Sequence, residues 1–309
     1  MNEVPIPDIR VGEPSTCGVL SLHPLYLERT LLGDDTPNYL LSDEAIAGGG
    51  CVVREMPEPK VEEVLVENAG DCRVLFVEGE MLAGAKQDRV LRSSVLVQAR
   101  SQIVVPVYCT QRRRWDPSSE NFKTASHAPP SLRLLLKEGS SRRHGGQVAV
   151  WRYVNSKHRA TATSSPSENM SDVLVRHPEV VEKVRQHFRY PEGACGVAVA
   201  VNGRTVGIDL FDTPKTLRKL WDRLVSGLAP DCLDRGGTDR LADEEQKPVR
   251  LYIESLRGLR WQEQPMVGAG RSYTATGSDS LATALVVDGK LLHLSLSVPV
   301  LKRAEPSWA

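Results

Sequence analysis

The amino-acid sequence predicts an α+β fold, with a β-meander or sandwich-like core, β-hairpins and a few packed helices. Short runs of β-branched residues, bounded by Gly, Ser, Gln or Arg, recur through residues 73–109 and indicate a strand meander. Two later segments place Asn202-Gly203 and Asp288-Gly289 between apolar flanks, which is the pattern of tight β-hairpins. We therefore expect hairpins and meanders rather than a βαβ series.

Length and composition are those of an ordinary soluble globular protein. The 309 residues can bury a substantial core as one large domain or two smaller ones. The formal net charge of +0 argues against non-specific binding to nucleic acid or membranes. Residues 1–13 lack the apolar core of a signal peptide, and no apolar run approaches the ~18 residues of a membrane-spanning helix. A cytoplasmic protein is expected, with neither membrane nor nucleic acid among its partners.

The six cysteines form no CxxC motif, and none has a nearby His at metal-site spacing. We expect them to be reduced and structural. No cluster of Asp and His predicts a bound metal, although Glu78, Glu80 and Asp88 could hold Mg²⁺ through a phosphate. The sequence identifies no cofactor.

Composition suggests the domain organisation. Residues 1–36 are rich in Pro and turns and form an N-terminal arm with the first strand. Residues 37–155 form a β-rich lobe, and residues 172–300 form an α+β lobe with both hairpins. The two lobes are separate domains or parts of one continuous domain. Residues 161–171 are polar and lack strong apolar residues, which is typical of a linker or mobile loop.

In the first half of the chain, strands are predicted from apolar runs and their breaks. Val19–Leu27 alternates as a strand does and is broken at Pro24. Ser42 is the predicted N-cap of a short helix that Gly48-Gly49-Gly50 ends. The other predicted strands are Cys51–Glu55, Val61–Glu67, Val74–Val77, Val90-Leu91 with Ser93–Val97, and Ile103–Val107.

In the second half, helix signals become more frequent. Ser131 is the predicted N-cap of a helix over Ser131–Lys137, and Gln147–Val154 is a strand or a helix turn. The remaining predictions are helices at Pro178–Phe188 and Pro214–Leu228, a strand at Val249–Leu256, and a surface loop with a short helix at Asp231–Gln246.

The densest cluster of polar groups lies in residues 78–89, between two predicted strands. Its glycines let the backbone turn or approach a ligand closely. Glu80 is a candidate general acid/base, and Gln87 could orient a sugar hydroxyl or a water. Lys86 and Arg89 could hold phosphate, Arg89 through two oxygens at once.

A basic segment follows this cluster. Residues 100–160 contain 12 Lys and Arg but only 3 Asp and Glu, a local excess of +9 that suggests an anionic ligand. Arg114, Trp115, Gln147 and Trp151 are candidate residues of the same pocket, with a Trp stacking on a base.

The same residues also have a purely structural interpretation. Glu80, Lys86 and Arg89 would form ion pairs that pin the ends of the meander, while Gln87 satisfies a buried backbone group. The basic segment would then be a solvated face.

Other candidates are weaker. Asp209 ends an apolar strand, and a cap or ion pair is its expected role. His293 lies in a hairpin strand and is expected to be a satisfied core histidine. Gly268-Ala269-Gly270-Arg271 lacks the Lys and following helix of a P-loop, and the chain has no nucleophile-elbow motif for a serine hydrolase.

Gly79-Glu80 is followed by Gly84-Ala85-Lys86-Gln87-Asp88-Arg89-Val90 and then by Val105-Pro106-Val107-Tyr108-Cys109. Together these segments resemble the bacterial and archaeal family of ADP-ribosylglycohydrolase- and rhodanese-phosphatase-associated proteins, over residues 17–297. Where that family usually has Glu-Gln-Gly-Arg-Trp, this chain has Gln111-Arg112-Arg113-Arg114-Trp115. The resemblance implies a place in ADP-ribose or NAD-derived metabolism and partner enzymes of that metabolism.

Three hypotheses of function follow. The first is an enzyme that acts on an anionic nucleotide or ADP-ribose-like phosphoester, with Glu80, Lys86, Gln87 and Arg89 at its centre. The second is a non-catalytic module that binds such a nucleotide or metabolite for partner enzymes. The third is a structural or assembly protein of a partner complex. The first two share one partner, an anionic, nucleotide-like small molecule.

Overall fold

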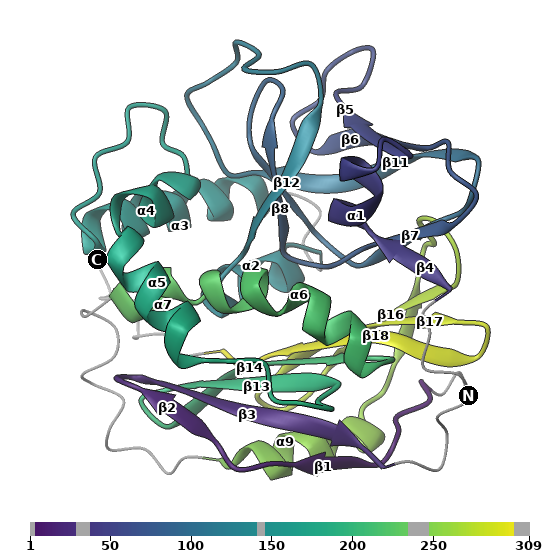
Figure 1. Ribbon diagram of the computed structural model, residues 1–309, viewed down its shortest axis with the longest axis vertical. Coiled ribbons are helices and arrows are strands. Elements are labelled where there is room, and N and C mark those ends of the chain that lie inside the picture. The colour runs from purple at the N-terminus through teal and green to yellow at the C-terminus, as the bar shows by residue number, and fades with distance from the viewer. Residues whose placement is uncertain (1–3, 29–37, 141–145, 234–246, 300–309) are drawn as a thin grey trace, which may run out of the picture.

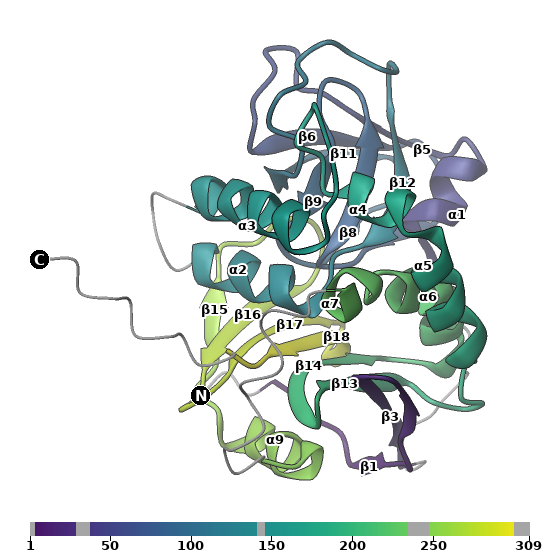
Figure 2. The same cartoon turned by 90° about the vertical axis from the view of Figure 1, so that its left-hand side faces the viewer.

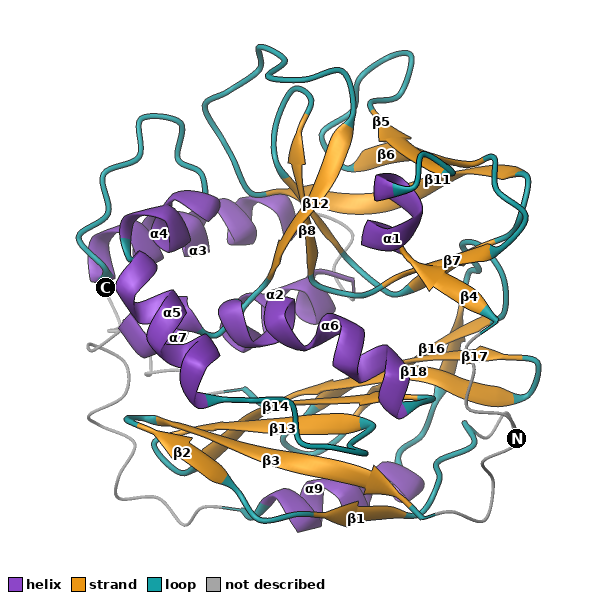
Figure 3. Cartoon of the chain, in the orientation of Figure 1, coloured by secondary structure: helices purple, strands orange, loops and turns teal. Residues whose placement is uncertain are grey.

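The computed structural model describes residues 4–28, 38–140, 146–233 and 247–299 (Figure 1). These residues form an α+β fold, as predicted, with mostly antiparallel sheets. Within the described residues there are sheets of nine, six and three strands, and helices lie between the largest sheet and the six-stranded one (Figures 1 and 3).

The nine-stranded sheet joins the two ends of the described chain. Its strand order is β1-β3-β13-β14-β18-β17-β16-β15, and β2 also pairs with β3. Because β3 pairs with β13 in antiparallel register, the N-terminal arm and the C-terminal hairpins share one sheet. The strands are β1 (Ile9–Val11), β2 (Ser15–Cys17), β3 (Leu20–Leu27), β13 (Gly196–Val201), β14 (Arg204–Phe211), β15 (Gln262–Gln264), β16 (Arg271–Thr276), β17 (Leu281–Val287) and β18 (Lys290–Ser297).

Both predicted hairpins are confirmed. Asn202-Gly203 joins β13 to β14, and Asp288-Gly289 joins β17 to β18. All four residues have positive φ, between 49° and 77°. This is the backbone of a type I′ turn, whose twist matches that of the flanking strands.

The six-stranded sheet curls on itself, with strand order β12-β8-β9-β11-β6-β5. A bridge between Arg54 and Asn121 joins its first and last strands, so we call it the small barrel. Its apolar interior includes Val53, Leu82 and Phe122. The strands are β5 (Cys51–Arg54), β6 (Glu63–Asn68), β8 (Glu80–Gly84), β9 (Arg89–Leu91), β11 (Ser101–Cys109) and β12 (Phe122–His127).

The three-stranded sheet links the small barrel to the large sheet. Its order is β10-β7-β4, formed by Val95–Val97, Arg73–Phe76 and Tyr39–Leu41, and β4 pairs with β7 in parallel. A bridge between Leu96 and Ala269 connects it to the segment before β16.

The helices cover both faces of the large sheet. Figures 1 and 2 show α2, α5, α6 and α7 between the large sheet and the small barrel, while α9 covers the opposite face of the sheet. None of the helices in the described ranges has the length and apolar character needed to cross a membrane. The helices are α1 (Ser42–Ala47), α2 (Pro130–Ser140), α3 (Gly146–Ala160), α4 (Ser171–Arg176), α5 (Pro178–His187), α6 (Pro214–Ser226), α7 (Ala229–Leu233) and α9 (Val249–Ser255), with a 3-10 turn η2 (Leu256–Gly258).

Strand β13 shows how one sheet serves two cores. Val197 and Val199 face α6 and pack in one cluster with Trp221. Ala198 faces the other side and packs in a second cluster with Tyr252 of α9. The alternation follows from the two-residue period of a strand, and it explains why β13 is apolar along its whole length.

Two strand predictions need correction. Strand β3 continues through Pro24, whose carbonyl accepts a hydrogen bond from the Gly12 N–H at 2.8 Å. The predicted single meander over residues 73–109 is divided between two sheets, because β7 and β10 pair with each other while β8, β9 and β11 belong to the small barrel.

Two helix starts also differ from prediction. Helix α1 begins at Ser42 itself, and the Leu41 N–H is capped by the Glu44 carboxylate at 3.0 Å. Helix α2 begins at Pro130, and Asp231 from α7 accepts the Ser131 N–H at 3.2 Å. A distant carboxylate thus does the capping that was predicted for a local hydroxyl.

Two segments of the second half, one predicted ambiguously and one predicted as a strand, are helical. Gln147–Val154 lies within α3, and the strand predicted at Val249–Leu256 is wrong, because that segment forms α9 and the first residue of η2. Its buried residues follow the spacing i, i+3, i+4 and i+7, which identifies a helix: Val249, Tyr252, Ile253 and Leu256. The predicted helices at Pro178–Phe188 and Pro214–Leu228 are present as α5 and α6.

The polar segment 161–171 packs against the molecule. Thr161, Thr163, Asn169 and Met170 are buried, and the Met170 N–H donates to the Thr110 carbonyl at 3.0 Å. Of the loop predicted at Asp231–Gln246, residues 234–246 lie outside the described residues.

Gly227, just after α6, tests how closely that helix is held against β12. Its backbone is in the ordinary helical region, and an added Cβ would overlap the His127 carbonyl oxygen. Gly227→Ala is expected to lower the free energy of unfolding by about 1–3 kcal/mol, measured by urea denaturation. Gly258→Ala is the matched control, since no atom lies within 4 Å of its added Cβ. Equal stability of Gly227→Ala and the wild type would contradict this packing.

Candidate functional site

The turn between β8 and β9 carries the Gly-Ala-Lys-Gln motif at one end of the small barrel. Gly84 has φ +119°, and an added Cβ would come within 2.9 Å of the Asn121 carbonyl oxygen, so this position requires glycine. Ala85 has φ +41°, in the left-handed region that non-glycine residues seldom adopt. The Ala85 N–H donates to Ser119 Oγ at 3.0 Å. The surrounding loop therefore holds the turn in an uncommon conformation.

Asp88 fixes the turn from within. One carboxylate oxygen accepts the Gly84 N–H and an Arg114 N–H, both at 3.1 Å. The other accepts Asn169 Nδ2 at 2.9 Å and Ser171 Oγ at 3.3 Å. Asp88 therefore ties the motif to the buried loop before α4.

Arg114, a predicted ligand-binding residue, is engaged with the protein itself. Its guanidinium donates to the Ala85 carbonyl at 2.6 Å, the Gly84 carbonyl at 3.1 Å and Gln111 Oε1 at 2.7 Å. These bonds, together with the Asp88 contact, clamp the turn in place.

Gln87 and Arg89, two of the four residues predicted at the centre of the site, are in contact with each other and are buried. Arg89 donates to Gln87 Oε1 at 3.1 Å and lies 3.5 Å from a Glu55 carboxylate oxygen. Gln87 Nε2 donates to the Gln111 carbonyl at 2.9 Å. In this structure both side chains bind protein groups under the turn.

Lys86 points the other way, toward Trp115. The Lys86 Nζ lies 4.9 Å from the centre of the Trp115 ring, which is 45% exposed. Among the described residues, no carboxylate forms an ion pair with this ammonium. Lys86 and Trp115 are thus two predicted site residues that lie in contact, and both side chains are at least partly exposed.

Gln147 and Trp151 approach the motif from α3. The Gln147 side-chain amide donates to and accepts from the Cys109 backbone, both at 2.8 Å, as a neighbouring strand would. Arg112 lies over the Trp151 ring at 5.5 Å. Burial raises the pKa of the Cys109 thiol, although the charge of Arg89 opposes this.

Glu80 lies in a separate cluster. Ser42 Oγ donates to its carboxylate, as do the Val77 N–H at 3.2 Å and Arg223 at 3.2 Å. Burial raises the pKa of Glu80, and the Arg223 charge only partly offsets this. In the described chain, the Glu80 side chain has no hydrogen bond or ion pair with Lys86, Gln87 or Arg89.

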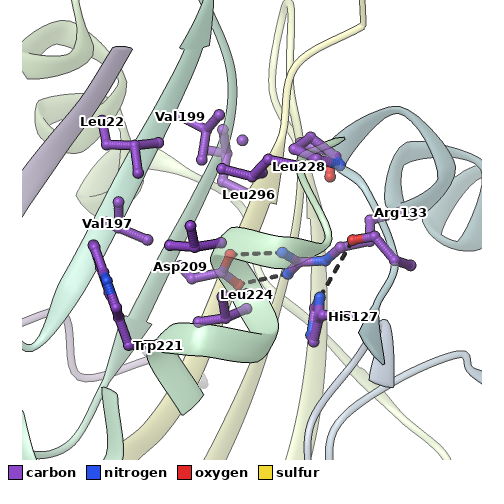
Figure 4. A pocket seen from close by; sticks show the side chains of 15 residues that line it. Leu22, His127, Arg133, Val197, Val199, Asp209, Trp221, Leu224, Leu228 and Leu296 are labelled. Carbon is purple, nitrogen blue, oxygen red and sulfur yellow. Dashed lines mark hydrogen bonds and ion pairs between the residues drawn. The ribbon is translucent and has the colours of Figure 1, made fainter. Parts of the chain in front are cut away.

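A second concentration of buried charge lies where the small barrel, α2 and the large sheet meet. We call Glu78, Arg133, Lys137 and Asp209 the buried charge network. Arg133 donates to both Asp209 oxygens, at 2.6 and 2.5 Å (Figure 4). Lys137 Nζ donates to Glu78, and Arg133 Nε lies 3.5 Å from the same carboxylate.

Hydroxyl groups from the large sheet complete this network. Ser295 Oγ and Thr283 Oγ1 donate to the two Glu78 oxygens at 3.1 and 2.6 Å. Burial alone would raise the pKa of Glu78, but Lys137 and Arg133 outweigh it and hold that pKa below its ordinary value. Burial likewise opposes ionisation of Asp209, whereas Arg133 holds its pKa far below the usual range. Both carboxylates are therefore ionised.

His293 joins the network to the small barrel. Its Nε2 lies 3.2 Å from Asp209 Oδ1, and its Nδ1 lies 2.7 Å from Ser94 Oγ. The ring stacks on Phe211 with centroids 4.6 Å apart. Asp209 and His293 are thus buried and partnered, and Asp209 makes the ion pair that was expected of it.

A cavity borders the network on its α6 side (Figure 4). Apolar residues from the sheet and α6 form most of its wall, and His127, Arg133 and Asp209 form the polar part. Its volume is about 20 Å³, which holds about one water molecule. His127 Nδ1 lies 3.3 Å from the Ala128 carbonyl, whereas the buried Nε2 has no partner.

Sequence reasoning missed His127, Arg133 and Lys137. A signal for two of them was present, because Arg133 and Lys137 are four residues apart and share a helix face with Leu132 and Leu136. Two cations on an apolar face require buried acids. The positions of those acids, Glu78 and Asp209, depend on the tertiary fold.

The residues in the described ranges contain no group of three or more His, Cys, Asp or Glu side chains arranged to hold a metal ion. Glu78 and Asp88, considered for Mg²⁺ through a phosphate, are instead neutralised by Lys137 and Arg114 respectively.

A family model described as "ARG and Rhodanese-Phosphatase-superfamily-associated Protein domain" (ARPP-1) matches residues 8–297. The match includes all of residues 17–297, on which the resemblance was drawn. No curated protein and no solved structure matches the chain.

The pH dependence of stability tests the environment of His127. Burial, assisted by the Arg133 charge, lowers the pKa of His127 to about 3, whereas the unfolded chain has an ordinary value of about 6.5. The neutral ring therefore stabilises the fold fully above pH 6.5, and this contribution is lost as the pH falls toward 3. Between pH 7 and pH 5 the wild type should lose about 2 kcal/mol more than His127→Gln.

Chemical denaturation at each pH measures this difference. His187→Gln is the control, because His187 is exposed and should show no such difference from the wild type. Parallel curves for the wild type and His127→Gln would mean that His127 is solvated in the folded protein.

Proposed function

The chain belongs to the family of ARG and Rhodanese-Phosphatase-superfamily-associated Protein domains, and from that premise we propose that it binds an anionic, nucleotide- or ADP-ribose-like phosphoester. The proposed site is the surface formed by Lys86 and Trp115 on the motif turn. Taking ARG to denote ADP-ribosylglycohydrolase, the ligand would come from ADP-ribose or NAD-derived metabolism, and the partners would be enzymes of that metabolism.

One observation carries the proposal: Lys86 has no ion pair among the described residues, and it sits 4.9 Å from a half-exposed indole ring. An ammonium beside an aromatic face can hold a phosphate while the ring stacks on a base. Arg112 lies over the Trp151 ring in a second cation–aromatic contact, and Arg112 also forms an ion pair with Glu168 at 3.9 Å.

The turn beneath Lys86 is rigid enough to present it. Arg114 and Asp88 clamp the backbone of Gly84 and Ala85, and the left-handed Ala85 is maintained by these bonds. A group fixed before binding loses little conformational freedom when the ligand arrives. We therefore assign phosphate contact to Lys86, and we assign support of the turn to Gln87, Arg89 and Arg114.

The proposal has a stronger and a weaker form. In the stronger form the protein is an enzyme that turns over the bound phosphoester. In that form Glu80 is the general acid/base, since burial raises its pKa toward the range useful for proton transfer. Its separation from Lys86 favours the weaker form, a binding module that presents the ligand to partner enzymes. A structural or assembly role for the motif surface is the remaining alternative.

Removal of the Lys86 or Trp115 side chain should weaken binding of the proposed phosphoester ligand directly. Lys86→Ala and Trp115→Ala are each expected to raise the Kd for ADP-ribose about tenfold, a loss of about 1.4 kcal/mol, measured by isothermal titration calorimetry. Arg10→Ala is the matched control, because Arg10 makes a similar contact with Tyr26, at 4.3 Å, on the large sheet. Unchanged affinity in Lys86→Ala, or no binding by the wild type, would rule out this site.

Glu80→Gln separates the enzyme from the binding module. If Glu80 transfers a proton, this variant should bind ADP-ribose 1″-phosphate as the wild type does but release phosphate about 10²–10⁴ times more slowly. Binding without phosphate release by the wild type itself would identify a binding module. A changed oligomeric state in Lys86→Ala, seen by light scattering before any change in affinity, would favour the assembly role.

A further inference from the structure

We propose that Ser94 is a nucleophile, with His293 as its general base and Asp209 as the positioning residue, acting on small uncharged esters. Ser94 Oγ lies 2.7 Å from His293 Nδ1, and His293 Nε2 lies 3.2 Å from Asp209 Oδ1. This site lies beyond the end of β9 opposite to the motif turn, so it is independent of the ligand proposed for Lys86.

The direction of each hydrogen bond follows from Asp209. Its carboxylate is held ionised by two bonds from Arg133, so it can only accept, and the proton of His293 must lie on Nε2. Nδ1 then carries a lone pair and accepts the Ser94 hydroxyl proton. The Glu78 N–H donates to Ser94 Oγ at 2.9 Å, which leaves that proton directed at His293. A serine hydrogen-bonded to a base that a carboxylate orients is the arrangement required for nucleophilic catalysis.

The three side chains are held by rigid elements. Asp209 and His293 lie on the paired central strands β14 and β18, and Phe211 stacks on the imidazole with ring planes 22° apart. Ser94 lies between β9 and β10, where hydrogen bonds with the Glu78 N–H and with His293 hold its hydroxyl in place. Such preorganisation means that little rearrangement is needed when a substrate arrives.

A small pocket adjoins Ser94. Its wall is made of hydroxyl and apolar side chains together with His293, and it contains no carboxylate, Lys or Arg. Its volume is about 10 Å³, room for about one water-sized group, which limits the reacting part of a substrate to a small acyl group. The uncharged wall favours a neutral ester over a phosphate. The wall residues besides Ser94 and His293 are Ser93, Ser272, Thr283, Ala284 and Leu285.

The proposed reaction balances without any cofactor. Ser94 Oγ attacks the ester carbonyl carbon, and its proton passes to His293 Nδ1. The bond to the leaving alcohol breaks, and the alcohol takes that proton. A water then attacks the acyl-serine, giving its proton to His293, and the acyl bond breaks as Ser94 recovers a proton. The products are an alcohol and a carboxylic acid.

Acylation by p-nitrophenyl acetate tests the nucleophile. The wild type should release nitrophenolate and carry an acetyl group on Ser94, mapped by peptide mass spectrometry. Ser94→Ala should lose the labelled peptide and at least tenfold of the release rate, with circular dichroism confirming that it is folded. Absence of acetyl-Ser94 in the wild type, or an unchanged rate in Ser94→Ala, would overturn the proposal.

A cysteine substitution tests the base even if Ser94→Ala is poorly folded. In Ser94→Cys, His293 should promote thiolate formation, so iodoacetamide should alkylate Cys at this position with a pH midpoint at least about 1 unit below the usual 8.5. Ser93→Cys is the matched control, because Ser93 lines the same pocket and has no hydrogen bond to His293 in the described chain. Equal pH midpoints for the two cysteines would mean that the Ser94 contact with His293 is only structural.

Discussion

The buried charge network of Glu78, Arg133, Lys137 and Asp209 is the constraint on which the arrangement of the molecule depends. It joins a helix, the small barrel and the large sheet through three different segments of the chain. Removal of one member would leave a buried charge without its partner, which typically costs about 3–5 kcal/mol. These distant segments are therefore held in one relative position. Apolar contacts are not directional and would fix that position less strictly.

The network also explains the surroundings of His127. Arg133 lies beside this ring, and both Asp209 oxygens are taken by the same guanidinium. His127 is consequently kept neutral and close to a cationic group, at the edge of a cavity that holds about one water molecule. Gly79 and Gly227 leave the space that the His127 residue occupies, since an added Cβ at either position would clash with it. The space left by the two glycines and the charge of Arg133 thus both act on the His127 residue.

The small barrel places two kinds of chemistry at opposite ends of β9. Before this strand, Asp88 and Arg114 hold a strained turn that presents Lys86 to solvent. After it, Ser94 meets His293 of the large sheet. One end therefore carries a partly exposed cation, suited to an anion, while the pocket at the other end is lined by side chains without formal charge. The division of the predicted meander between two sheets produces this separation, because β9 stays in the barrel while β10 pairs with β7.

Local physical chemistry allowed much of the fold to be predicted from the sequence. Asn202-Gly203 and Asp288-Gly289 specify their hairpins because few residues tolerate two successive positive φ angles. Thr213 and Pro214 start α6 at the expected position, and the motif turn contains the expected glycine. The contact between Gln87 and Arg89 follows from their neighbouring positions on one strand and its turn.

Only the tertiary structure decided which distant polar groups meet. Ser94 and His293 are 199 residues apart, and Arg133 and Asp209 are 76 apart, so no local pattern could pair them. The strand prediction at Val249–Leu256 was wrong because a run of only seven or eight residues is compatible with both the side-chain period of a strand and that of a helix. By itself the sequence determined the turns, most of the elements and the family. The fold determined the network, since buried charges find their partners only when the sheets and helices are assembled.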